Sequence, residues 1–470
     1  MGGFGESVAS LFLPELCRKG DAQNEAQASQ VGLGALASAL SMGTSLSEGR
    51  DAYHAVRVAY LTARITGVLE LPENEARPAV FGALLHDVGV PVLGPELADA
   101  IDYLDTEVWA LLPREPLERI AATTGRRPAR IQALLSSHTR RGMQIVEGLP
   151  TPKGTDQVVF SHHECWNGSG FPHGASGNDT SVAARVVAFA DAIDARARGR
   201  YGEPAAQEFL QEFARSESGQ MFDPEVAGVL AELAKDDRFW SDLGTGNPGD
   251  ALWRVFEDEP LTNGRLRDTL WSVAEIADAR SRYRAAHSPG VASYAQLLAA
   301  EMGYRGKEVD VLRRAALLHD IGLLGVPSTV LDKTGELTES EWQYVRRHSG
   351  YTRDILSNVT GLTTEPRIAG EHHEWVNGQG YPDGLSGVGI SAMGRILAVA
   401  DSYEALTSDR PWRRSLEPDE ALKLMQTGSR TKYDPSILEA MYTVVEEFVL
   451  APTTLTVEAG GEKPTIRKAA

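Results

Sequence analysis

The chain has 470 residues, of which 42% are hydrophobic, and a formal net charge of −19, as expected of a soluble protein with at least two domains. The acidic balance argues against a nucleic acid polymer or an anionic membrane as a partner, although metal ions could still attract a small phosphate ligand locally. Two cysteines, no apolar run of about 18 residues and no cationic leader predict a cytoplasmic protein without a disulfide framework.

Helical patterns dominate the predicted elements. In chain order, we expect helices over residues 33–47, 57–70, 79–85, 182–195, 266–284, 312–318 and 390–406. Glycine- and proline-rich loops cover 167–172 and 377–382, and the best linker lies within 244–264. Because strand alternation is scarce, the expected fold class is all-α, with two tandem bundles that form a pseudo-dimer.

Ten of the 11 histidines fall into two matching sets. The first set, with its acidic neighbours, is His54, His86, Asp87, His138, His162, His163 and Asp191. The second set is His287, His319, Asp320, His348, His372, His373 and Asp401. The first two histidines are 32 residues apart in both sets, and only the interval between the second and third differs, at 52 against 29 residues. Such recurrence indicates a duplicated unit, copy one and copy two.

The residue types in each set predict a metal centre. A single histidine is more often a hydrogen-bonded core residue, but neutral imidazoles grouped with carboxylates suit iron, manganese, nickel or zinc. The carboxylate of an adjacent His-Asp pair can bridge two cations, so six or seven ligands per copy predict two metals per site. Such centres, with ions about 3.5–4 Å apart, hold a bridging hydroxide and promote displacement at phosphorus. Hydrolysis of a phosphoester by a metal-activated hydroxide is the expected chemistry.

Several motifs of copy two resemble a known family. They are Leu317-Leu318-His319-Asp320-Ile321-Gly322, the run 331–338, Glu371-His372-His373-Glu374, Gly380-Tyr381-Pro382 and the run 399–413. Together they resemble the HD-GYP phosphodiesterases of the HD-domain phosphohydrolase superfamily. Copy one is similar but diverges, with Phe171 where the family has tyrosine. The expected organisation is a divergent HD-type metal-binding domain over 28–260, an HD-GYP-type catalytic domain over 264–450 and a flexible tail over 451–470.

The resemblance implies hydrolysis of a cyclic nucleotide, with cyclic di-GMP as the usual substrate of the family, by a centre of iron or related metals. In copy two, the first implied metal ligands are His287, His319, Asp320 and Asp401. Asp320 would bridge to a second metal, bound by His348, His372 and His373. In copy one the corresponding sets are His54, His86, Asp87 and Asp191, with His138, His162 and His163. The loop of Gly380, Tyr381 and Pro382 would shape the substrate entrance.

Two departures from the family pattern bear on activity. The lysine of the family's His-Asp-x-Gly-Lys motif is replaced by Leu323 in copy two and by Val90 in copy one. The glutamate that trinuclear members carry four residues before the first histidine is replaced by Arg50 and Tyr283, which favours two metals per site. The expected catalytic residues are Asp320 and three cations that could replace the lysine, namely Lys333, Arg410 and Arg413.

Three functions are compatible with these residues. The first is a phosphodiesterase of a cyclic di- or mononucleotide, with copy two as the main catalytic domain. The second is an HD-domain phosphomonoesterase or nucleotide phosphohydrolase, for which copy one is the better seat. The third is a signalling protein that binds a nucleotide without turnover. A homo-oligomer is compatible with all three.

Overall fold

The computed structural model describes residues 25–47, 51–90, 128–197, 199–245 and 248–450. The predicted tail over 451–470, Arg50 and most of the segment that lengthens copy one lie outside the described residues. Helices dominate the described part, so the predicted helical fold class is confirmed. No helix in these ranges is long and apolar enough to cross a membrane.

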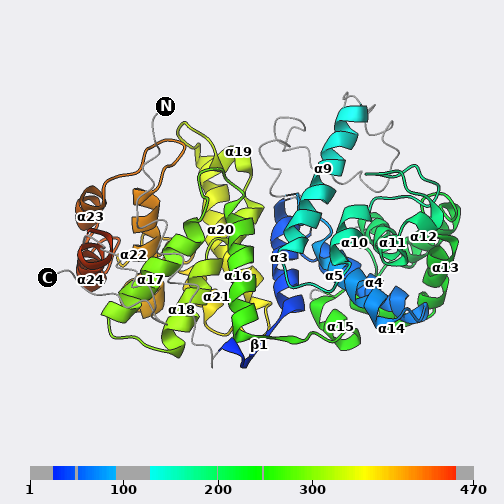
Figure 1. Cartoon of the computed structure of the whole chain (residues 1–470), viewed down its shortest axis with the longest axis horizontal. Helices are drawn as coiled ribbons and strands as arrows, with labels where there is room; N and C mark the ends of the chain where they lie inside the picture. Colours follow the sequence, from blue (N-terminus) through cyan, green and yellow to red (C-terminus); the bar gives the residue numbers. More distant parts are fainter. Residues whose placement is uncertain (1–24, 48–50, 91–127, 198, 246–247, 451–470) are drawn as a thin grey trace, which may run out of the picture.

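Copy one is built mainly from helices (Figure 1). Its elements are β1 (Ala28–Gly32), α3 (Leu33–Ser47), α4 (His54–Val68), α5 (Glu73–Leu85), α9 (Pro128–Glu147), α10 (Thr155–Ser161), η2 (Gly177–Asp179), α11 (Val182–Ala197), α12 (Pro204–Ser216), α13 (Pro224–Leu233), α14 (Asp237–Leu243) and α15 (Pro248–Val255).

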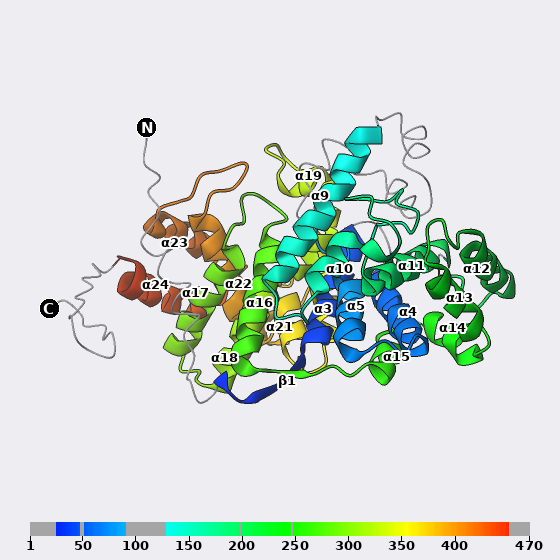
Figure 2. The same cartoon turned by 45° about the vertical axis from the view of Figure 1, so that its right-hand side comes forward.

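Copy two repeats the plan at the other end of the molecule (Figures 1 and 2). Its elements are β2 (Pro260–Thr262), α16 (Asn263–Asp278), α17 (His287–Glu301), α18 (Lys307–Leu318), η3 (Ile321–Gly325), α19 (Ser328–Leu331), α20 (Glu339–Ser357), α21 (Glu365–Gly370), η4 (Gly387–Gly389), α22 (Ala392–Thr407), α23 (Pro418–Thr427), α24 (Pro435–Val445) and η5 (Glu446–Leu450).

Two segments differ from the sequence prediction. The helix expected over 266–284 ends at Asp278, and residues 279–286 turn into α17. The turn is fixed because the Asp278 carboxylate accepts hydrogen bonds from the Ser288 backbone and hydroxyl, both at 2.8 Å, at the start of α17. The expected linker over 244–264 contains α15, whose apolar residues Ala251 and Leu252 are buried against copy one.

A short two-stranded sheet joins the two copies. It was not predicted, because the sequence shows little of the alternation typical of strands. β1 pairs antiparallel with β2, so that Ala28 lies opposite Thr262 and Gly32 opposite Pro260. Each strand leads directly into a helix, β1 into α3 and β2 into α16. The two opening helices are therefore held at equivalent positions in the two copies.

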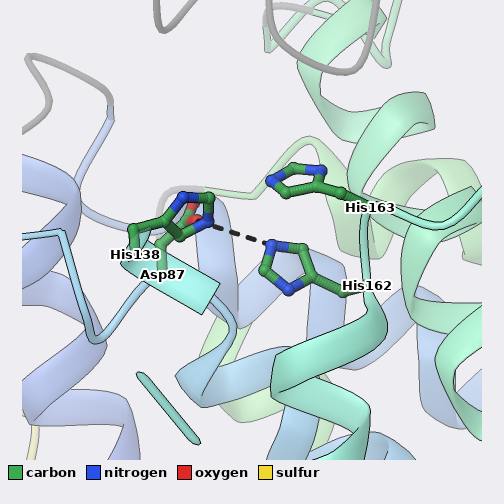
Figure 3. A group of neighbouring side chains, drawn as sticks. All are labelled: Asp87, His138, His162 and His163. Carbon is green, nitrogen blue, oxygen red and sulfur yellow. Dashed lines mark ion pairs between the residues drawn. The ribbon is translucent and has the colours of Figure 1, made fainter. Parts of the chain in front are cut away.

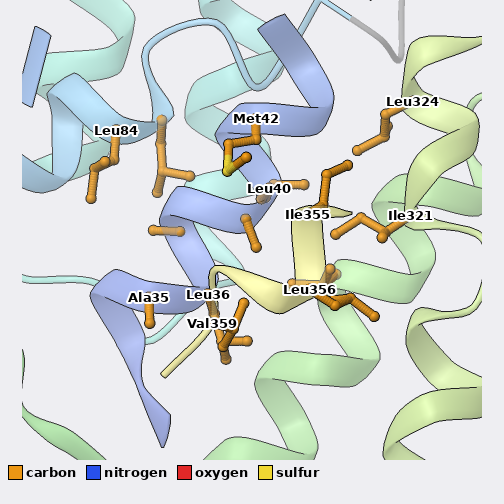
Figure 4. Close-up of a cluster of buried hydrophobic side chains, with 14 of the residues drawn as sticks. Ala35, Leu36, Leu40, Met42, Leu84, Ile321, Leu324, Ile355, Leu356 and Val359 are labelled. Atoms are coloured by element: carbon orange, nitrogen blue, oxygen red, sulfur yellow. The ribbon is translucent and has the colours of Figure 1, made fainter. Parts of the chain in front are cut away.

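Helix α3 lies between the copies and packs against both. It contacts α5 of its own copy, and η3 and α20 of copy two. Figure 4 shows Leu36 and Leu40 of α3 facing Ile321, Leu324, Ile355, Leu356 and Val359 of copy two. Gly43 allows the closest approach, since a Cβ there would lie 2.7 Å from the Cδ1 of Leu324. Burying a leucine side chain stabilises the folded chain by about 1.5–3 kcal/mol. The buried side chains of the two copies form one continuous core across this contact.

Two candidate metal centres

The ligand positions of copy two come from five helical elements that meet at one point. His287 is the first residue of α17, and His319 and Asp320 lie between α18 and η3. His348 lies in α20, His372 and His373 follow α21, and Asp401 lies in α22. The turn after His319 packs tightly on α20, because a Cβ at Gly322 would lie 2.1 Å from the backbone oxygen of His348. Glycine is therefore required two residues after Asp320.

Asp320 lies at the middle of the copy-two cluster. Its Oδ2 atom is 3.1 Å from the Nε2 of His319 and 3.4 Å from the Nε2 of His287. Its Oδ1 atom is 3.3 Å from the Nε2 of His348 and 3.8 Å from that of His372. The two oxygens therefore face two different groups of imidazoles, as a carboxylate that bridges two cations would.

The remaining residues complete these two groups. Asp401 lies beside the first group, with its Oδ1 atom 3.3 Å from the Nε2 of His287. His373 lies beside the second, its ring centre 5.1 Å from that of His348. The possible ligand atoms of His287, His319 and Asp401 lie within 4.8 Å of one another, as do those of His348, His372 and His373.

Copy one has the same arrangement around Asp87. Its Oδ2 atom is 3.0 Å from the Nε2 of His86, and its Oδ1 atom is 3.5 Å from the Nε2 of His138 and 3.7 Å from that of His162. Figure 3 shows His138, His162 and His163 gathered around this carboxylate. His54 and Asp191 lie on the other side, with 3.2 Å between Nε2 and Oδ1. The structure thus brings together every predicted ligand position in both copies.

Backbone hydrogen bonds orient half of the ten imidazoles. Five histidines place Nδ1 between 2.5 and 2.8 Å from the carbonyl three residues earlier, namely His86, His162, His319, His348 and His372. Such a bond keeps the proton on Nδ1 and turns the lone pair of Nε2 into the cluster. The Nε2 atoms of His86, His162, His287 and His319 are buried and face carboxylate oxygens of the clusters, between 3.0 and 3.7 Å away. A buried nitrogen lone pair that no donor reaches is suited to bind a metal ion.

Charge also favours cation binding. Burial lowers the pKa of His348 to about 4 and holds the pKa values of His372 and His373 well below the usual range, so these rings are neutral at neutral pH. Burial opposes ionisation of Asp401, but the neighbouring imidazoles of His287 and His319 keep its pKa well below the usual value. Ligands in these protonation states bind a metal without first losing a proton.

In each copy, a carboxylate contacts the Nδ1 atom of the first histidine of the ligand set. His54 Nδ1 lies 2.6 Å from Asp194, and His287 Nδ1 contacts Glu404 in the same way. Asp194 pairs with Arg57 at 2.7 Å, whereas Glu404 pairs with Arg410 at 3.3 Å. Such partners fix the orientation of a metal ligand and raise its basicity. The carboxylates were not predicted, although both lie three residues after the last aspartate of their set.

The glycine-rich loops lie beside the clusters. The Glu374 carboxylate accepts hydrogen bonds from the backbone of Asp383, Gly384 and Leu385, which fixes the loop of copy two. The ring of Tyr381 lies 4.8 Å from that of His373. In copy one Phe171 lies equally close to His163, at 4.7 Å, but has no hydroxyl group.

The three cations predicted to assist catalysis have other partners in the structure. Lys333 pairs with Glu341 at 2.7 Å, and Arg413 donates to backbone carbonyls at the end of α22. Arg410 lies behind His287, where it contacts Glu404, and not between the two imidazole groups. Their catalytic roles stay predictions. The cation that does reach the cluster is Arg284, whose guanidinium contacts Asp320. Sequence reasoning missed it, and its only signal was a position three residues before His287.

Comparison with known proteins agrees with this geometry. The HD domain family matches residues 110–226 and 268–437, which is more than half of the chain. The chain belongs to the HD-domain family. The predicted assignment to HD-domain phosphohydrolases of the HD-GYP type is therefore confirmed.

Relatives of this HD-domain chain include several Vibrio cholerae serotype O1 proteins. The 3'3'-cGAMP-specific phosphodiesterase 3 is 31% identical over 432 residues, which cover 86% of this chain and 92% of that protein. The 3'3'-cGAMP-specific phosphodiesterase 1 is 28% identical and covers 80% of this chain and 83% of its own length. The cyclic di-GMP phosphodiesterase response regulator RpfG of Xanthomonas campestris is 35% identical, over 38% of this chain and 47% of that protein.

A solved structure also resembles the whole chain. It is a cyclic GMP-AMP specific phosphodiesterase of V. cholerae, with a TM-score of 0.64 and 29% sequence identity. The match covers 89% of this chain and 98% of the other. The likeness therefore extends over both copies.

Proposed function

We propose that this protein is a metal-dependent phosphodiesterase that opens a cyclic dinucleotide, with 3'3'-cGAMP as its first candidate substrate. The observation that carries the proposal is the copy-two cluster, in which the two oxygens of Asp320 face two groups of buried imidazoles. The relatives that align over both copies are named for 3'3'-cGAMP, whereas the cyclic di-GMP phosphodiesterase RpfG aligns over 38% of the chain.

The proposed roles follow from the geometry. His287, His319 and Asp401 would bind one divalent ion, and His348, His372 and His373 a second, with Asp320 shared between them. Iron or manganese suits this mixed nitrogen and oxygen set best, and nickel or zinc is compatible with it. Two such ions would activate water and neutralise charge that develops on the phosphate.

The chain's own residues do the rest. Asp320 fixes the spacing of the two groups, and Glu404 holds His287 in place. The ring of Tyr381, beside His373, would form one wall of the entrance for the nucleotide. Gly380 allows this loop to approach the cluster, because a Cβ there would lie 2.3 Å from the backbone nitrogen of Trp375.

Copy two is proposed as the catalytic copy. Both copies hold a full ligand set, but only copy two has a tyrosine on the loop beside the histidine pair, and it has a cation in contact with the central carboxylate. Copy one has phenylalanine at the loop position. We assign copy one a second metal centre without a catalytic role.

The test is turnover by the protein loaded with manganese or iron, against a panel of cyclic di- and mononucleotides, with products separated by chromatography. We expect 3'3'-cGAMP to give a linear dinucleotide. His319→Ala with Asp320→Ala should abolish cleavage, while the matched pair His86→Ala with Asp87→Ala should retain it.

Each other outcome points to a different function. Cleavage that survives loss of the copy-two pair but not of the copy-one pair would move the active site. Release of phosphate from ordinary nucleotides would favour a phosphomonoesterase in copy one. Tight binding of a cyclic nucleotide without turnover in any metal would favour a sensor.

A further inference from the structure

The run 331–338 is a motif of copy two that contains none of the metal-ligand positions. Its last residue, Thr338, caps α20. Asp332, near its start, instead contacts the turn of residues 279–286, which leads from α16 into α17. The two ends of the run therefore have different tasks, and that of Asp332 concerns the turn.

Both carboxylate oxygens of Asp332 are bound to consecutive residues of this turn. The Ser281 hydroxyl donates to Oδ1 at 2.5 Å, and the Arg282 Nε donates to Oδ2 at 3.2 Å. The Asp332 side chain is 9% exposed and Ser281 is buried, whereas the Arg282 side chain is 66% exposed. A hydrogen bond shielded from water is stronger than an exposed ion pair, so the inner bond to Ser281 is the one that holds the turn.

A second bond joins the turn to the same part of copy two. Arg280 is fully buried, and its Nε donates at 3.0 Å to the carbonyl of Val326, the residue that follows η3. Burying a charged side chain costs free energy unless it is hydrogen-bonded, so this bond is not easily given up. Arg280 and Asp332 thus tie the turn to both ends of the segment 326–332, and η3 connects that segment to Asp320.

The turn leads directly to the first metal ligand. Its last residue, Ala286, has a left-handed backbone with a φ of 59°, and His287 follows as the first residue of α17. A residue other than glycine is strained in this conformation and keeps it only where surrounding contacts impose it. Bonds at both ends of the turn supply such contacts, to Asp332 near its start and between Asp278 and Ser288 across it.

The position of the turn sets one distance in the metal centre. The Nε2 of His287, after the turn, lies 3.4 Å from the Oδ2 of Asp320, before η3. The other imidazole group belongs to α20 and the end of α21. Helix α20 packs on the segment 326–332 through an apolar cluster that includes Val330 and Val345. Loss of the Asp332 bonds would therefore loosen the group of His287 and leave the other group in place.

We infer that Asp332 is a positioning residue for the first metal of copy two. Together with Ser281 and Arg280 it forms a turn clamp, which holds the turn 279–286 so that His287 and Asp320 can share an ion. The inference rests on the proposed function for the two-metal centre, but not for the identity of the substrate.

The test follows the binding of each manganese ion to copy two in the full-length protein. His86→Ala with Asp87→Ala disables the copy-one centre in every sample. Stepwise Kd values come from titration calorimetry, and the Tm of each metal-free protein from thermal melts. Addition of His319→Ala or His372→Ala identifies which step belongs to which imidazole group.

Three variants alter the turn clamp and one serves as the control. Asp332→Ala removes both of its bonds, Ser281→Ala removes only the inner bond, and Asp332→Asn keeps an oxygen that can accept from the Ser281 hydroxyl. The control is Asp354→Ala, which removes an aspartate of α20 whose side chain is 75% exposed. It changes the charge of the chain as Asp332→Ala does.

We expect Asp332→Ala to weaken binding at the group of His287 by about 10- to 100-fold, as loss of residues that orient metal ligands does elsewhere. The Kd of the other group should not change. Ser281→Ala should weaken the same step to a smaller extent, whereas Asp332→Asn and the control should match wild type. A residue that only stabilised the fold would instead lower Tm and weaken both steps together.

The inference is overturned if both steps weaken equally, or if the control weakens the first step as much as Asp332→Ala does. An unchanged first step in Asp332→Ala and Ser281→Ala overturns it too. If Asp332→Ala does not fold, Ser281→Ala decides. If these variants lose the first ion selectively but wild type cleaves no cyclic dinucleotide, the proposed function fails and the positioning role of Asp332 stands.

Discussion

Replacement of Thr352 by valine tests how α20 is held against the His319-Asp320 turn. The Thr352 hydroxyl is fully buried, donates to the carbonyl of His319 at 2.8 Å and accepts from the backbone of Gly322 at 3.1 Å. It therefore links the helix that carries His348 to both sides of Asp320. Copy one has Gly142 at the matched position and lacks this link.

The size of the effect follows from these two bonds. Valine has nearly the same shape as threonine, so packing is retained and the main loss is hydrogen bonding. Two buried bonds at about 1 kcal/mol each give a loss of about 2 kcal/mol in the free energy of unfolding. For a unit of the size of copy two, this lowers Tm by about 4–8 °C. A small shift of Asp320 relative to His348 should also weaken metal binding by about tenfold, as for other residues that orient ligands.

Calorimetric unfolding and metal titration would measure both effects. Thr352→Ser is the control, because it keeps the hydroxyl and should retain metal affinity. If Thr352→Val unfolds at the wild-type Tm and binds metal as wild type does, the link does not position the copy-two cluster, and the reasoning is wrong.

Three further predictions test the centres. Gly322→Ala should abolish cyclic dinucleotide cleavage, because its Cβ would lie 2.1 Å from the carbonyl oxygen of His348. The matched variant Gly89→Ala places its Cβ equally close to His138 and should disturb only copy one. Loss of cleavage in both variants would contradict the proposed division of roles. Chelation of metal should abolish cleavage and lower Tm, because a ligand present at about 100 times its Kd stabilises the fold by about 2.7 kcal/mol. Added manganese should restore both cleavage and Tm. A chelated protein with full activity would exclude a metal mechanism. Because burial lowers the pKa of His348 from 6.5 to about 4, the unfolded chain binds more protons between these values, so the metal-free protein should lose up to about 3 kcal/mol of stability from this residue as pH falls from 6.5 to 4. His348→Gln should reduce that dependence in thermal melts, and an unchanged pH profile would refute the assignment.

The repeat and its chemistry could be predicted without the structure. The equal intervals between histidines predicted two clusters, and both are present, because ligands at the ends of helices keep their spacing when the helices are duplicated. Helices such as α3 and α11 were predicted from local apolar patterns, which depend only on neighbouring residues. The family resemblance was likewise carried by contiguous motifs.

Charge partners were harder to predict, because they depend on residues distant in sequence. Lys333, Arg410 and Arg413 were expected near the phosphate, but their partners are Glu341, Glu404 and backbone carbonyls. A positive residue within a sequence motif has many possible partners, and spacing along the chain does not select among them.

Tertiary structure alone decided how the copies meet and which cation reaches the cluster. The helix expected over 266–284 ends at Asp278 because that carboxylate binds Ser288, and the resulting turn carries Arg284 to Asp320. The contact of α3 with both copies likewise depends on Gly43, whose missing side chain admits Leu324. Hydrophobic periodicity reports which face of a helix is buried, but only the folded chain determines what that face meets.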